Sequence, residues 1–92
     1  KVLFSRWLNA EPKILIADEP SSGADVGAKT EIYRLLRELA SSGVGIILIS
    51  SDLNELLTVS DRILIMSHGQ IVDEVFSNTT TQEYIIRKGL DA

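Results

Sequence analysis

The chain has 92 residues, of which 45% are hydrophobic and 24% are charged, a balance that is typical of a globular protein and excludes a disordered tail. Its net charge of -4 argues against nucleic-acid binding through a broad basic surface. The sequence has no cysteine, which excludes disulfides and thiolate metal sites and favours a reducing, cytosolic compartment, and no apolar run approaches the roughly 20 residues that would insert across a bilayer.

Residues 1–8 have the spacing of an amphipathic helix, because Leu3 and Trp7, and likewise Phe4 and Leu8, stand four residues apart. At this spacing the aromatic side chains are predicted to belong to a core rather than to a base-stacking platform. No residue that commonly caps a helix precedes the segment. Two interpretations stay open: the chain begins within a helix of a longer protein, or this is a natural, frayed N-terminus.

The next segments alternate between strand and helix. Residues 13–18 form a nearly continuous apolar run, which predicts a strand buried on both faces and hence a parallel sheet. A turn over residues 19–25 leads to an amphipathic helix at residues 27–41, and residues 44–49 are predicted as a second buried strand. The apolar stripe of the helix consists of Ile32, Leu35, Leu36, Leu39 and Ala40.

The second half of the chain opens with a short helix, for which Asp52 and Glu55 have the spacing of a capping box. Two further strands are predicted at residues 62–66 and 70–76. The three residues between them, 67–69, indicate a tight hairpin turn.

A final helix is predicted for residues 81–88, opened by a capping box of Thr80 and Glu83. The series strand, helix, strand, helix, strand indicates the α/β class, with parallel crossovers and helices that cover a sheet. Sites in such sheets gather beyond the carboxyl ends of the strands. Two strand ends carry polar residues suited to chemistry, at residues 18–19 and 50–52.

Asp18 and Glu19 form an acidic pair at the end of the first strand. An aspartate there is held rigidly and can bind Mg²⁺, which prefers a few hard oxygen ligands together with substrate phosphates. Glu19 is expected to point in another direction, because side chains alternate along a strand, and so to reach an attacking water. This division of roles suits nucleotide hydrolysis. In the alternative interpretation both residues merely end the strand, and Asp18 caps a turn.

The sequence around this pair resembles the ATP-binding cassette (ABC) ATPases. Residues 14–29 resemble the Walker B strand and D-loop of that family, and residues 46–55 stand where it carries its switch region, or H-loop. Residues 60–66 and 69–71 resemble the following strand pair, and residues 1–8 the helix after the LSGGQ-type signature. The resemblance covers nearly the whole chain and implies a partial P-loop NTPase sheet with flanking helices, without its Walker A half.

A narrower resemblance concerns the tandem ATPase subunits of bacterial monosaccharide importers for ribose, galactose or xylose. Residues 25–29 and 31–33 look like the second cassette of these subunits, as does the Ser-Ser-Asp of residues 50–52. The resemblance implies that residues 1–92 are the C-terminal fragment of a single cassette. It also implies a second cassette and transmembrane permease subunits as partners, and a peripheral location on the cytoplasmic face of the cell membrane.

The resemblance further implies roles for particular residues. Asp18 would hold Mg²⁺, Glu19 would polarise the attacking water, and ATP would be the nucleotide. Asp25 resembles the D-loop aspartate that couples two cassettes, although it could also cap the following helix. Ser51 stands at the switch position, where ordinary cassettes have histidine. The one histidine of the chain, His68, lies in the predicted turn and cannot take that role.

Parts of the family's nucleotide site do not occur in this sequence. A G-x-x-x-x-G-K-[ST] loop, which would cradle phosphates, is absent, as are the Q-loop and the signature. We therefore expect the isolated chain to be inactive and to self-associate through uncovered apolar surfaces. Two other hypotheses stay open: a non-catalytic structural or interaction module, and a fragment of another ABC-type ATPase, such as an exporter or a chromosome-maintenance protein.

Overall fold

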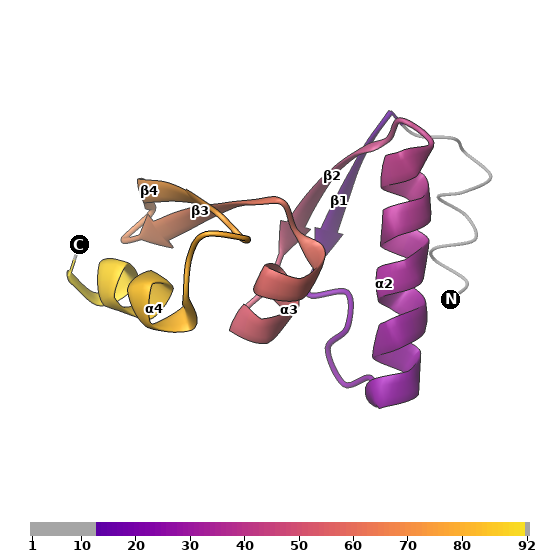
Figure 1. Cartoon of the computed structure of the whole chain (residues 1–92), viewed down its shortest axis with the longest axis horizontal. Helices are drawn as coiled ribbons and strands as arrows, with labels where there is room; N and C mark the ends of the chain where they lie inside the picture. Colours follow the sequence, from indigo (N-terminus) through magenta and orange to yellow (C-terminus); the bar gives the residue numbers. More distant parts are fainter. Residues whose placement is uncertain (1–12, 92) are drawn as a thin grey trace. The chain divides into compact units, whose positions relative to one another are not determined.

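The computed structural model describes residues 13–91 of the chain (Figure 1). The chain divides into two compact units, Lys1–Ser50 and Ser51–Ala92, here called the N-terminal and C-terminal units. The predicted helix at residues 1–8, with Leu3, Phe4 and Trp7, lies outside the described residues. Within residues 13–91, every helix is too short or too polar to cross a membrane.

The N-terminal unit is a strand–helix–strand motif made of β1 (Ile14–Asp18), α2 (Val26–Ser41) and β2 (Gly45–Ile49) (Figure 1). The two strands are parallel, and their register runs from the Ile14–Gly45 pair to the Asp18–Ile49 pair. The predicted parallel crossover is therefore confirmed for these two strands. The α/β class is confirmed as well, since helices alternate with short sheets along the chain.

One helix covers one face of this parallel pair. Leu15 and Ala17 of β1 are buried, as are Leu36 and Leu39 on the apolar stripe of α2. Leu15 and Leu36 are each only 2% exposed. The amphipathic period of residues 27–41 thus places the apolar stripe where it can pack, and polar residues such as Arg34 remain exposed.

The other face of the pair is open, which corrects the prediction of strands buried on both faces. Ile14 and Ile16 of β1 are 64% and 60% exposed, and Ile47 and Ile49 of β2 are 53% and 47% exposed. The physical reason is that the described part of this unit has a single helix, which can cover only one side of a sheet.

The C-terminal unit contains α3 (Leu53–Val59), β3 (Arg62–Ser67), β4 (Gln70–Phe76) and α4 (Gln82–Asp91). The strands β3 and β4 are antiparallel, with a register shift between Ile65 and Met66. They form a sheet of their own, so that β3 does not extend the parallel pair as the strand–helix series predicted. A tight turn after β3 returns the chain at once and makes β4 its antiparallel neighbour.

The predicted hairpin turn is confirmed. His68 and Gly69 have φ values of +53° and +78°, and Ser67 pairs with Gln70. This pattern identifies a two-residue type I′ turn, which needs positive φ at both central positions.

Ile63, Ile65 and Ile85 form the buried core of this unit. Partly buried side chains pack against them from α3 and β4, namely Leu53, Leu56, Leu57, Val72 and Val75. The period-2 pattern of β3 leaves Leu64 and Met66 exposed on the opposite face.

The cap of α4 differs from the predicted Thr80–Glu83 box. Thr81 Oγ1 accepts a hydrogen bond from the Tyr84 amide at 3.2 Å, so Thr81 is the cap and the helix begins at Gln82. Thr80 Oγ1 is buried without a hydrogen-bond partner among the described residues. The three consecutive threonines at positions 79–81 explain the one-residue error, because each could cap a helix.

Candidate functional site

The acidic pair lies at the carboxyl end of β1, as predicted. Asp18 is the last residue of the strand, is exposed, and shares the open face of the sheet with Ile14 and Ile16. Glu19 is half-buried, and its amide donates to the Ile49 carbonyl at 2.7 Å, which adds one more hydrogen bond to the parallel ladder. The carboxyl ends of both strands are thus joined beside the pair.

The direction of the Glu19 side chain is not set by strand alternation, contrary to the prediction. Glu19 lies outside β1 and has φ of +48°, in the left-handed region. Strand alternation therefore does not set the direction of its side chain. A local turn of the backbone separates it from Asp18 instead.

The loop from Glu19 to Asp25 consists of two successive turns. The Ser22 amide donates to the Glu19 carbonyl at 3.2 Å, and the Ala24 amide donates to the Ser21 carbonyl at 3.0 Å. Gly23, with φ of +76°, occupies the third position of the second turn, where a positive φ is required for a type II turn. Ser21 is 5% exposed, so the middle of the loop is anchored in the unit.

Asp25 ends this loop and caps α2. Its Oδ1 accepts a hydrogen bond from the Ala28 amide at 2.8 Å, and its backbone is extended, as expected of an N-cap residue. The capping interpretation is confirmed. The exposed carboxylate leaves room for the second, coupling role, which stays a prediction.

Ser51 is exposed and belongs to the C-terminal unit. It directly precedes Asp52, whose side chain caps α3 by accepting from the amides of Asn54 at 3.0 Å and Glu55 at 3.3 Å. The predicted Asp52 cap is therefore confirmed. Glu55 is only 2% exposed, a burial of a carboxyl group that the capping pattern alone does not indicate.

The carboxylate of Asp18 could bind Mg²⁺ only together with waters and substrate phosphates. Among residues 13–91, no group of three or more His, Cys, Asp and Glu side chains is gathered as a metal site. Mg²⁺ does not need such a group, because it commonly binds through one or two carboxylates, with waters and substrate phosphates as its other ligands. A single exposed aspartate at a strand end suits that mode of binding.

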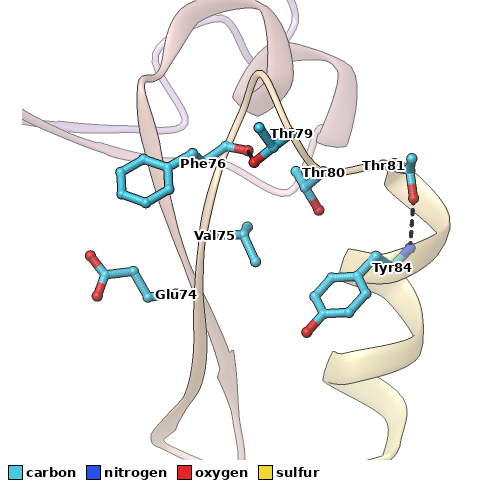
Figure 2. Close-up of a pocket in the computed structure, with 7 residues that line it drawn as sticks. All are labelled: Glu74, Val75, Phe76, Thr79, Thr80, Thr81 and Tyr84. Carbon is cyan, nitrogen blue, oxygen red and sulfur yellow. Dashed lines mark hydrogen bonds between the residues drawn. The ribbon is translucent and has the colours of Figure 1, made fainter.

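A separate pocket lies in the C-terminal unit and contains none of the predicted site residues. Its volume is about 390 Å³, and Figure 2 shows its lining from β4, the following loop and the start of α4. The lining residues are Glu74, Val75, Phe76, Thr79, Thr80, Thr81 and Tyr84. Its polar groups are mostly engaged locally. Glu74 pairs with Arg62 at 3.2 Å, and Thr81 caps α4.

Tyr84 and Asp73 beside this pocket were not singled out by the sequence, because they lie eleven positions apart in different elements. The Tyr84 hydroxyl donates a hydrogen bond to an Asp73 carboxylate oxygen. This bond lowers the pKa of Asp73, aided by the Glu74 amide, and raises the pKa of Tyr84. The pair joins α4 to β4 and requires no ligand to explain it.

Comparison with known proteins identifies relatives of this chain. No protein-family model matches it. The chain is 58% identical over 86 residues to the xylose import ATP-binding protein XylG of Geobacillus kaustophilus (strain HTA426). It is 55% identical over 87 residues to the galactose/methyl galactoside import ATP-binding protein MglA of Escherichia coli (strain K12) and of Sodalis glossinidius (strain morsitans).

These matches cover 94–95% of this chain but only 17% of the relatives' own length. At such identity over almost the whole chain, the predicted relationship to sugar importer ATPases is confirmed at the level of homology. The chain is thus homologous to a segment, 17% in length, of the ATP-binding proteins of sugar ABC importers.

Proposed function

We propose that this chain is the C-terminal part of the second nucleotide-binding cassette of an ATPase subunit that energises monosaccharide import. The observation that carries the proposal is the acidic pair Asp18–Glu19 at the carboxyl end of a parallel strand, in a chain homologous to sugar import ATP-binding proteins. Xylose and galactose, named for the relatives, indicate a pentose or hexose as the imported class.

In this proposal the two carboxylates have separate roles. Asp18, exposed at the end of β1, would hold Mg²⁺, which would supply positive charge to the phosphate oxygens. Glu19 accepts a hydrogen bond from the attacking water and orients it toward the terminal phosphate of ATP. Asp25, at the far end of the same loop, couples this cassette to its partner.

The partners in the intact assembly are a second cassette and transmembrane permease subunits, with the ATPase on the cytoplasmic face of the cell membrane. Sugar selectivity belongs to the permease and its binding protein. The isolated chain contributes the carboxylates but no G-x-x-x-x-G-K-[ST] loop, whose backbone amides and lysine bind phosphates. It should therefore not turn over ATP alone.

Substitution of Glu19 tests the proposal. In a protein of the relatives' length that contains this chain, Glu19→Gln should keep ATP binding and lower hydrolysis by on the order of 10³-fold, because the amide is a far weaker base. Asp18→Asn should weaken Mg²⁺-dependent nucleotide binding. Glu38→Gln, an exposed change on α2, is the control. Full hydrolysis by the Glu19→Gln protein would favour a non-catalytic module.

A further inference from the structure

The backbone of Glu19 has a conformation that a residue with a side chain disfavours. Its φ of +48° is in the left-handed region, where Cβ approaches the following carbonyl oxygen. Among the described residues only one other non-glycine residue, His68, has a positive φ. The type I′ hairpin turn demands this conformation of His68, whatever its side chain does. No hairpin explains it at Glu19.

Backbone hydrogen bonds hold Glu19 on both sides. Its amide donates to the Ile49 carbonyl at 2.7 Å, and its carbonyl accepts from the Ser22 amide at 3.2 Å. A return of φ to the negative region would rotate the carbonyl relative to the amide, so that both bonds could not persist. The conformation is therefore imposed by the junction of β1, β2 and the first turn of the loop.

We propose that this junction positions the Glu19 carboxylate by means of a left-handed backbone, at a residue where glycine or asparagine would be more stable. The inference rests on the proposed function, because it takes the water-orienting carboxylate as the reason for a glutamate here. An extended backbone at Glu19 would continue β1 and fix the side chain by strand alternation. The left-handed backbone gives it a different direction from the same point of the sheet.

The strain is measurable without nucleotide, on the 92-residue chain. At an ordinary position glycine is less stable than alanine, because glycine loses more conformational freedom on folding. At a left-handed position the order reverses. We expect Glu19→Gly to melt about 4–8 °C above Glu19→Ala. This is the change in melting temperature that the cost of a left-handed backbone at alanine produces in a domain of this size.

Matched controls come from the same chain. Ser22, exposed and without a positive φ, should show the ordinary order, with Ser22→Gly melting below Ser22→Ala. His68→Gly should melt above His68→Ala, as at Glu19. The proposal is overturned if Glu19→Gly melts at or below Glu19→Ala while the Ser22 and His68 pairs behave as described.

The positioning role needs a kinetic test in a protein of the relatives' length that contains this chain. Pro20→Gly keeps the carboxylate but frees the residue that fixes the turn after Glu19. We expect kcat to fall by on the order of 10-fold with KM for ATP unchanged, because misplacement of a reacting group slows chemistry without weakening substrate binding. An unchanged kcat for Pro20→Gly overturns the positioning role, even where Glu19→Gln abolishes hydrolysis. Hydrolysis that survives Glu19→Gln overturns both this inference and the proposed function.

Discussion

The two units each contain a two-stranded sheet, but they connect their strands in different ways. In the N-terminal unit, β1 and β2 are parallel and the 16-residue helix α2 joins them, whereas a two-residue turn joins the antiparallel strands β3 and β4. A parallel pair has both carboxyl ends at one edge, so Asp18 pairs with Ile49 and polar loops leave the sheet side by side. A hairpin has no such edge. The parallel connection thus brings the end of β2 beside the acidic pair Asp18–Glu19.

The units also share a feature, since each sheet has one closed and one open face. Ile16 and Ile47 lie on the open side of the parallel pair, and Leu64 and Met66 on that of the hairpin. The closed face of the hairpin packs a cluster that includes both α3 and α4, whereas α2 is the single helix over the parallel pair within residues 13–50. The stability of the N-terminal unit therefore depends more on the packing of one helix than that of the C-terminal unit does.

The largest expected effect is the loss of that packing. Leu36→Ala removes a side chain that is 2% exposed and should lower the free energy of unfolding by about 2–5 kcal/mol. Amide exchange should accelerate in β1 and β2 and stay unchanged in β3 and β4. The matched change Ile65→Ala should show the reverse pattern. Equal acceleration in all four strands would contradict the division into two units.

A second prediction concerns Ser51, the first residue of the C-terminal unit. A serine hydroxyl at position 51 is shorter than an imidazole and does not titrate near neutrality. If Ser51 stands at the switch position, as the family resemblance implies, Ser51→His in a protein of the relatives' length that contains this chain should raise single-turnover hydrolysis by on the order of 10²-fold. Ser50→His serves as the control. An unchanged rate would show that Glu19 suffices without a switch histidine.

The open faces should drive self-association of the isolated chain. Ile47→Lys places a charge in the middle of the open face of the parallel pair and should shift the chain toward monomer in sedimentation equilibrium. Met66→Lys makes the same change on the hairpin. If the open face of the parallel pair drives association, Ile47→Lys has the larger effect. An equal response to both changes would contradict a leading role for the parallel pair.

The sequence allowed the positions of the described strands and helices to be predicted, because hydrophobic period, caps and turn residues act locally. Asp18, Glu19 and Asp25 fall where the pattern placed them. Burial of β1 on both faces was predicted wrongly, because the burial of a strand depends on which segments, distant in the sequence, pack against it. The left-handed backbone of Glu19 was not predicted, because it results from hydrogen bonds to Ile49 and Ser22 rather than from its own preference.

The N-caps of α2 and α3 offer a smaller test of the comparison between the two units. Asp25→Ala removes the cap of α2 and should destabilise the N-terminal unit by about 1 kcal/mol, and Asp52→Ala should do the same for α3. Replacement of Asp25 by Asn keeps the capping acceptor and removes the charge, so Asp25→Asn should retain stability. A loss of stability with Asp25→Asn would indicate that the charge of this residue matters to the fold as well as its oxygen.

The smallest effect is the pH dependence of the contact between α4 and β4. Because the Tyr84 hydroxyl lowers the pKa of Asp73, the stability from their hydrogen bond is present above the unfolded value of about 4 and is lost as pH falls through the lower folded pKa. Because the same bond raises the pKa of Tyr84, its contribution is present below about pH 10 and is lost as pH rises through the higher folded pKa. Both shifts report one hydrogen bond, between an exposed tyrosine and a half-buried aspartate, so they count once. Tyr84→Phe should therefore lower the melting temperature slightly at neutral pH, where the bond is formed, and leave it nearly unchanged at the acid and alkaline ends, so that the pH profile becomes flatter. A Tyr84→Phe chain that keeps the full acid dependence would show that other carboxylates set it, and that the Tyr84–Asp73 bond adds little to the apolar packing around Ile85.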